Sequence, residues 1–189
     1  PFLTATGTRN EEVTRAHPGD DVLLRANFAW IGTDGEALNM TSDVIRGRKN
    51  GDLLRGTPAC SKCDRLGITW SKQKQFFRLD DTDELNFAHA MQRYELTYPC
   101  PEALRSEWPA FSPTGDERCF TTSDTAQTHK RLAIRALGAA GAEDVTIHSY
   151  RGTLVSAMYV AKAAGHAQFS EGVMQAHVRH KTLDAMYGY

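Results

Sequence analysis

The sequence predicts one domain that combines helices with a few short strands. Residues 66–70 and 75–79 are two short apolar segments separated by a polar turn, which is the pattern of a β-hairpin. Asp124 and Gln127 open a helical segment that runs to about Leu137 and ends at glycines. The length of 189 residues, of which 41% are hydrophobic, is enough for one domain with a sizeable core.

The first third of the chain predicts a helix, a strand and a long loop. A helix is expected to begin near Thr8 and to end at the Pro18–Gly19 stop signal. Residues 22–31 are apolar enough for a strand, and the glycines of residues 32–35 indicate a turn after it. Residues 41–65 are polar, basic and glycine-bearing, and we expect them to form a long loop.

The middle of the chain predicts two helices separated by a proline-rich loop. Residues 81–84 resemble a capping box, and the helix after them is expected to bury four side chains, Leu85, Ala88, Met91 and Tyr94. Four prolines between residues 99 and 113 then interrupt regular structure. In the helix that begins at Asp124, the residues expected to face the core are Leu132, Ala136 and Leu137.

The hydropathy of the sequence argues against a membrane-spanning protein and against a secreted one. No apolar run approaches the length of a membrane span, and the N-terminal residues lack the pattern of a secretory signal, so an intracellular, soluble protein is expected. The net charge of −1 gives no global attraction for nucleic acid. Local basic surfaces remain available, and the candidates are Arg46, Arg48, Lys49 and Arg55 in one group and Lys72, Lys74, Lys130, Arg131, Arg179 and Lys181 in another.

The chain has four cysteines, for which two readings stay open. Cys60 and Cys63 have the spacing of half a zinc site, and the remainder would be Cys100 and Cys119 or a histidine. A second knuckle with that spacing is absent from the sequence. Free thiols in a reducing compartment are the alternative.

The C-terminal segment carries the residues with the clearest chemistry. It contains His148, Arg151, His180 and Tyr189, which are the groups needed to bind a phosphodiester and to attack it without a metal. Arginine offers a planar fork of donors to two phosphate oxygens and stays protonated at any working pH. A tyrosine hydroxyl has a pKa of about 10 and needs a base as it attacks, for which His148 is the candidate.

Each of these residues also has an ordinary structural reading. A His-x-x-Arg pattern is common, and a tyrosine near a chain end is usually a surface or core residue. Arg9 and Glu12 are spaced for a surface ion pair, and Lys72 lies where a solvated turn lysine is normal. The interpretation therefore depends on finding these elements together and in order.

Taken in order, the motifs resemble the catalytic domain of the tyrosine recombinases, the phage integrase family. Residues 6–12 are similar to that family's Thr-Gly-x-Arg-x-x-Glu segment, and residues 71–74 are similar to its hairpin with a mobile lysine. The resemblance covers essentially the whole chain, 1–189, and implies six catalytic residues: Arg9, Lys72, His148, Arg151, His180 and Tyr189. Lys74 is the alternative to Lys72, and Tyr187 the alternative to Tyr189.

The resemblance implies a mainly helical α+β fold with a small antiparallel sheet, and site-specific cutting and rejoining of double-stranded DNA. It implies a 3′-phosphotyrosyl intermediate, no cofactor or metal, and homotetramers on two DNA sites inside the cell, in the nucleoid or the nucleus. The chain begins at Pro1 and ends at the proposed nucleophile, so a fragment lacking an N-terminal core-binding domain is expected. Alternatives are relaxation of one duplex, as in type IB topoisomerases, a non-cleaving DNA-binding domain of this fold, and a zinc-binding interaction module.

Overall fold

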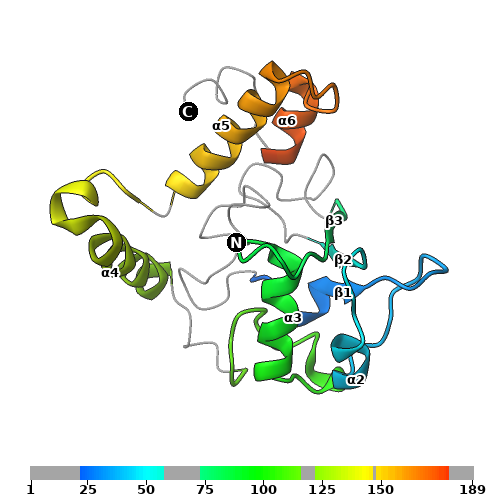
Figure 1. Cartoon of the computed structure of the whole chain (residues 1–189). Coiled ribbons are helices and arrows are strands. Elements are labelled where there is room, and N and C mark those ends of the chain that lie inside the picture. The colour runs from blue at the N-terminus through cyan, green and yellow to red at the C-terminus, as the bar shows by residue number, and fades with distance from the viewer. Residues whose placement is uncertain (1–21, 58–72, 116–121, 147, 179–189) are drawn as a thin grey trace.

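The chain folds into a mixed α+β structure in which helices predominate (Figure 1). The computed structural model describes residues 22–57, 73–115, 122–146 and 148–178. The α-helices in these ranges are α2 (Ser42–Arg46), α3 (Phe87–Thr97), α4 (Thr122–Gly141), α5 (Ser149–Ala163) and α6 (Glu171–Val178). The strands are β1 (Phe28–Trp30), β2 (Leu53–Gly56) and β3 (Gln75–Arg78), and two 3₁₀ turns, η2 (Arg25–Asn27) and η3 (Glu102–Leu104), complete the described elements.

The three strands form one antiparallel sheet in the order β1-β2-β3. Trp30 lies opposite Leu54, which lies opposite Phe77, so these three side chains share one face of the sheet. Gly56 lies between two aromatic rings on that face. A Cβ atom at this position would lie 3.1 Å from a ring carbon of Phe77 and 3.2 Å from a ring carbon of Phe28. The small antiparallel sheet agrees with the prediction, whereas the partner strand predicted at 66–70 lies outside the described residues.

The strand predicted over residues 22–31 is shorter than expected. Only Phe28–Trp30 pairs as a strand, and the residues before it form the 3₁₀ turn η2. The backbone N–H of Arg25 donates to the carbonyl of Trp108 at 2.9 Å, and that of Ala26 donates to the carbonyl of Arg105 at 2.8 Å. Carbonyls of the proline-rich loop therefore accept the hydrogen bonds that a neighbouring strand would otherwise accept.

The prediction of a loop over residues 41–65 is wrong for the part that is described. This segment contains α2, whose N-cap Thr41 accepts a hydrogen bond from the backbone of Val44, and β2, the central strand of the sheet. In β2 the buried Leu54 stands between the outward side chains of Leu53 and Arg55. The alternation extends over only four residues, which is too short to stand out in a polar, basic sequence.

Helix α3 begins later than predicted. Its N-cap is Asn86, whose side chain accepts from the backbone of His89 at 2.9 Å, so residues 81–84 are not the cap. Asp83 instead accepts from the backbone of Leu85 at 2.9 Å within a turn, and Leu85 is 78% exposed. Of the four predicted inward residues Leu85 is therefore wrong, while Ala88 and Met91 are buried and Tyr94 packs against the core.

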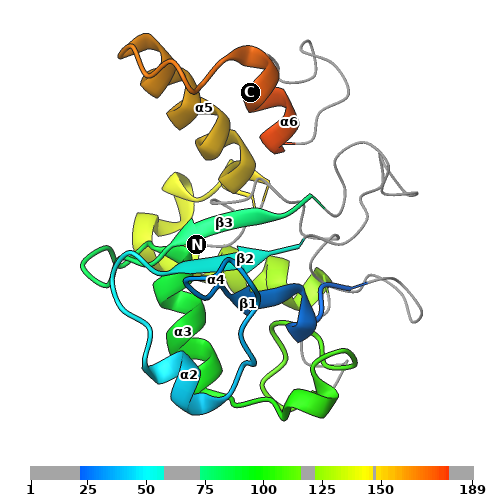
Figure 2. The same ribbon diagram turned by 90° about the vertical axis from the view of Figure 1, so that its right-hand side faces the viewer.

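The buried apolar residues form two separate clusters. The larger one joins the sheet to α2 and α3 and includes Phe28, Trp30, Ile45, Leu54, Phe87 and Met91. The smaller one joins α5 to α6 through Val155, Met158, Met174 and Val178. Figures 1 and 2 both show the α5–α6 pair above the sheet and α2 below it. In the part of the chain that the structure describes, apolar side chains are therefore buried in two places.

Helix α4 has the predicted extent but not the predicted inward face. Leu132, Ala136 and Leu137 are exposed, and the buried residue of this stretch is Ala133. Figure 1 shows α4 to one side of the other labelled elements, and the side chains of Leu132, Ile134 and Leu137 are exposed. The helix bends at Gly138, whose φ of 74° is accessible to glycine at little cost. Within the described ranges no helix has the length and apolar character needed to cross a membrane.

Candidate functional site

The candidate site begins at the first turn of α5. A turn precedes this helix, in which the backbone N–H of Thr146 donates to the Ser149 hydroxyl at 3.1 Å. His148 is the N-cap residue and is exposed, so its imidazole is accessible from solvent. The backbone N–H of Arg151 donates to the carbonyl of His148 at 3.0 Å. The predicted His-x-x-Arg pair therefore occupies one turn of one helix.

Arg151 is buried where α5 meets α6, with 2% of its surface exposed. Its Nη2 donates to the backbone carbonyl of Val178, the last residue of α6. Carbonyls in the last turn of a helix lack intrahelical donors and carry partial negative charge, so a guanidinium is a favourable partner there. The contact links the predicted His-x-x-Arg motif to the residue two positions before His180.

The packing between α5 and α6 fixes this geometry. Val155 and Met158 of α5 pack with Met174 and Val178 of α6, all at least nine-tenths buried. Lys162 and Glu171 also form an ion pair at 2.8 Å, but both side chains are about two-fifths exposed. An exposed pair of this kind contributes at most about 1 kcal/mol, so apolar burial holds the helices together.

The structure describes two of the six predicted catalytic residues. His148 and Arg151 are brought together on α5, whereas Arg9, Lys72, His180 and Tyr189 lie outside the described residues, as does Tyr187. Lys74, the alternative to Lys72, is exposed immediately before β3. The arrangement offers a solvent-accessible imidazole one helical turn from a buried guanidinium, whose Nη2 donates to the Val178 carbonyl.

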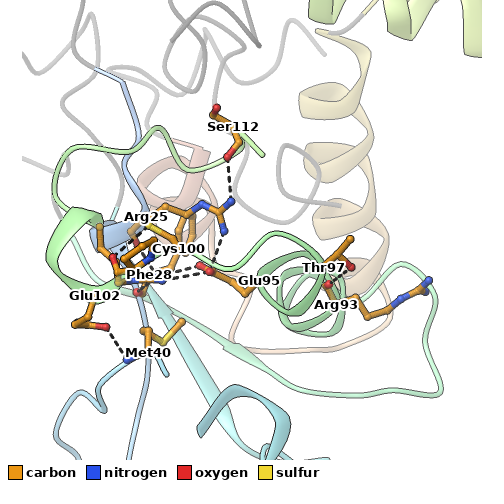
Figure 3. Close-up of polar contacts among 11 residues, drawn as sticks. Arg25, Phe28, Met40, Arg93, Glu95, Thr97, Cys100, Glu102 and Ser112 are labelled. Atoms are coloured by element: carbon orange, nitrogen blue, oxygen red, sulfur yellow. Dashed lines mark hydrogen bonds and ion pairs between the residues drawn. The ribbon is translucent and has the colours of Figure 1, made fainter. Parts of the chain in front are cut away.

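The larger core also contains a buried cluster of charged residues that the sequence did not predict (Figure 3). The Glu95 carboxylate lies between two guanidiniums, with Oε2 2.8 Å from Arg25 Nη1 and Oε1 2.9 Å from Arg105 Nη2. The relative exposures of Arg25, Glu95 and Arg105 are 0%, 1% and 3%. Two guanidiniums flank one carboxylate, so this trio carries a net charge of +1 and needs further acceptors.

Backbone carbonyls and an aromatic ring provide that compensation. Arg25 Nη2 donates to the carbonyl of Ser112 at 3.0 Å, and its guanidinium lies 4.4 Å from the centroid of the Tyr94 ring. Arg105 Nη2 also donates to the carbonyl of Arg25 at 2.9 Å. These bonds join η2, α3 and the proline-rich loop. The network organises the core, and its one sequence signal was a glutamate at a position where α3 faces inward.

A cavity of about 350 Å³ lies beside this network, lined by Met40, Thr41, Ser42, Ile45, Glu95, Pro99, Cys100, Pro101 and Glu102. Glu102 Oε2 accepts from the backbone N–H of Met40 at 3.1 Å across it. The buried Cys100 thiol lies 3.5 Å from the carbonyl of Pro101, and burial raises its pKa. Cys100 is therefore suited to a packing role more than to nucleophilic chemistry.

The zinc hypothesis remains a prediction. Cys60, Cys63 and Cys119 lie outside the described residues, and Cys100 is a free thiol. Within the described ranges, no three His, Cys, Asp or Glu side chains cluster closely enough to hold a metal ion.

Comparison of the chain with family models, with curated proteins and with solved structures gave no match. The functional assignment consequently depends on the residues and their geometry.

Proposed function

We propose that the chain is the catalytic domain of a tyrosine recombinase, which cuts and rejoins DNA through a covalent phosphotyrosyl intermediate. The observation that carries the proposal is the hydrogen bond from Arg151 to the carbonyl of Val178. It joins the first turn of α5 to the end of α6, from which His180 is two residues away in sequence. The bond therefore supports the proposal by holding the His-x-x-Arg turn against Val178, which lies two residues before His180 in the sequence.

The proposed reaction is a transesterification. The Tyr189 hydroxyl gives its proton to His148 and attacks phosphorus, so that a Tyr–O–P bond forms and the bond from phosphorus to the 5′ oxygen breaks. Lys72 gives the departing 5′ oxygen a proton. The energy of the phosphodiester is kept in the phosphotyrosyl bond, and a free 5′-hydroxyl reverses the step without ATP.

The remaining residues are proposed to stabilise charge on the phosphate. Arg9 and Arg151 bind the non-bridging oxygens, and His180 donates a hydrogen bond as negative charge develops. The anchoring of Arg151 on α6 supports this role, because a guanidinium held in one orientation loses less entropy when it binds a phosphate. His148 is exposed and one helical turn away, which suits a group that exchanges protons with substrate.

The proposed partners rest on the resemblance to the tyrosine recombinases. The substrate is double-stranded DNA, the active assembly is a homotetramer on two DNA sites, and the site of action is inside the cell with the DNA. The observed small antiparallel sheet among helices is compatible with the recombinase fold.

A non-cleaving DNA-binding domain is the second candidate, and the burial of Arg151 favours it. A guanidinium that is 2% exposed and bonded to a backbone carbonyl has a structural function in the absence of any substrate. Incubation of the protein with a nicked DNA site that traps the covalent intermediate separates the two candidates. An adduct that disappears in Tyr189→Phe supports the recombinase, and DNA binding without an adduct supports the second candidate. Relaxation of a supercoiled plasmid without joining of two sites would indicate a topoisomerase.

A further inference from the structure

We propose that the open face of the three-stranded sheet binds a nucleic acid strand with unpaired bases, with Phe76 stacking on a base while Arg55 and Arg78 bind phosphates. The inference rests on the proposed function in taking nucleic acid as the partner. It concerns different residues, and its test needs no cleavage. The open face is the β2–β3 part of one side of the sheet and is defined by Leu53 and Arg55 of β2 and by Phe76 and Arg78 of β3; on β1, Ala29 lies opposite Arg55 and is buried.

The register of the sheet places these four side chains on one face. Arg55 pairs with Phe76, and Leu53 pairs with Arg78, in the antiparallel ladder between β2 and β3. Directly opposite residues in such a ladder project to the same side. The alternate residues Leu54 and Phe77 belong to the larger core, and the Phe77 ring packs edge-on against Phe87 of α3 at 4.8 Å. Helix α3 therefore covers the opposite face.

Phe76 is 55% exposed on this face, and its neighbour across the ladder is a cation. Burial of this phenyl ring contributes little free energy to folding, because more than half of its surface stays in water. A ring flanked by arginines is, however, the arrangement with which proteins bind unpaired bases, because every base presents a π-face. Leu53 is also 38% exposed and extends the apolar surface.

The arginines on the face are available to a ligand. In the part of the chain that the structure describes, neither Arg55 nor Arg78 takes part in an ion pair. Arg78 is exposed, whereas Arg55 is half-buried and its Nε is covered, so a ligand would reach Arg55 through its Nη atoms. The four residues of the open face include no carboxylate. The nearby Asp80 has a lowered pKa chiefly because the Thr82 side chain donates to it, with Arg78 as the smallest contribution.

Charge complementarity points to a polyanion, and the exposed ring selects among polyanions. An acidic peptide would satisfy Arg55 and Arg78 but would leave Phe76 without a flat partner. A nucleic acid strand supplies phosphates for the arginines and a base for the ring. A duplex keeps its bases stacked, so the single strand is expected to bind more tightly to this face.

The test is fluorescence anisotropy of a labelled 20-nucleotide oligothymidylate, titrated with the full 189-residue chain carrying Tyr189→Phe so that no cleavage occurs. Phe76→Ala is expected to weaken binding by about 5-fold or more, and Phe76→Tyr to retain it. Arg55→Gln with Arg78→Gln is expected to reduce the slope of log K against log salt by about 1.4, from two lost phosphate contacts. The matched controls, Leu85→Ala and Arg93→Gln, alter an exposed apolar and an exposed basic residue elsewhere and should leave binding unchanged.

Unchanged binding in Phe76→Ala, or equal competition by polyglutamate of matched charge, would overturn the proposal. Thermal melting of each variant checks that it folds; little change is expected for the exposed Phe76 and Arg78, and the melt is the necessary check for the half-buried Arg55. Failure of the open-face proposal can be distinguished from failure of the proposed recombinase function. Loss of the covalent adduct in every assay, with oligothymidylate binding intact and dependent on Phe76, would refute the recombinase and leave the open face standing.

Discussion

Arg151 donates a hydrogen bond to the backbone carbonyl of Val178, and so connects the first turn of α5 to the last residue of α6. The contact has two consequences. It gives a buried guanidinium an acceptor at a helix C-terminus, where partial negative charge is available. It also couples the orientation of Arg151 to the chain segment that leads to His180, so that displacement of α6 would disturb the proposed phosphate clamp.

Replacement of Arg151 by lysine is predicted to lower the rate of DNA cleavage by about 10²-fold or more. An ammonium lacks the planar fork that holds two phosphate oxygens, and the loss of one transition-state donor has an effect of this size. Single-turnover formation of the covalent adduct measures the rate. Arg135→Lys, an exposed arginine of α4, is the matched control. Near-normal cleavage in the Arg151→Lys protein would remove Arg151 from the mechanism.

Replacement of Glu95 by glutamine is predicted to destabilise the fold by about 3–5 kcal/mol. The change leaves the buried guanidiniums of Arg25 and Arg105 without their shared carboxylate. Urea denaturation followed by circular dichroism measures the free energy of unfolding. Glu107→Gln alters an exposed carboxylate in the proline-rich loop that follows α3 and should change stability by less than about 0.5 kcal/mol. Equal free energies of unfolding for Glu95→Gln and Glu107→Gln would show that the buried trio does not stabilise the fold.

Two substitutions around α3 test the corrected inward face. Met91→Ala removes a side chain from the core and is expected to cost about 2–5 kcal/mol. Leu85→Ala alters a side chain that is 78% exposed, and the expected change is below about 0.5 kcal/mol. The same denaturation experiment measures both. A loss of unfolding free energy in Leu85→Ala as large as that in Met91→Ala would show that Leu85 faces the core, as the sequence predicts.

The Cys100 thiol is predicted to resist alkylation in the folded protein. Burial raises its pKa, so the reactive thiolate is scarce near neutral pH. In the unfolded chain the thiol ionises near its ordinary pKa of about 8.5, whereas in the folded chain it ionises at higher pH. The contribution of Cys100 to stability is therefore constant below that ordinary value and declines as pH rises through it.

Peptide mapping after brief iodoacetamide treatment, with and without denaturant, measures the modification of Cys100 itself. Protection in the native protein and full modification in denaturant are expected. Urea denaturation at pH 7.5 and pH 9.5 compares the wild-type protein with Cys100→Ser, and the wild type is expected to lose more stability at the higher pH. Rapid native modification of Cys100 would contradict its burial.

The sequence predicted the elements whose pattern is long enough to repeat. Helix α4 was located within a few residues because its helical segment is long and ends at glycines, and Ala88 and Met91 were identified as buried from their spacing. Strand β2 was missed because four residues with one buried leucine give almost no periodicity. Leu132 and Leu137 were misassigned because an apolar face indicates burial only if another element is there to cover it.

The candidate site was predicted by residue type, and its supporting contacts were not. His148 and Arg151 were singled out from their chemistry and spacing, but the bond from Arg151 to Val178 depends on how α5 packs against α6. The trio of Arg25, Glu95 and Arg105 joins residues up to 80 positions apart, a proximity that no local pattern reveals. Charged residues also predict exposure by default, since their burial needs partners that only the tertiary structure supplies.

The most direct test of the proposed function is to identify the residue that becomes joined to DNA. The protein is incubated with nicked DNA sites that trap the intermediate, the adduct is digested with protease and nuclease, and the modified peptide is sequenced by mass spectrometry. Tyr189→Phe and Tyr187→Phe variants are treated in parallel. The predicted result is a nucleotide joined to Tyr189 through a phosphotyrosyl bond, absent from Tyr189→Phe and present in Tyr187→Phe. Specific binding of those sites with no adduct, or an adduct that persists in Tyr189→Phe, would contradict the proposal.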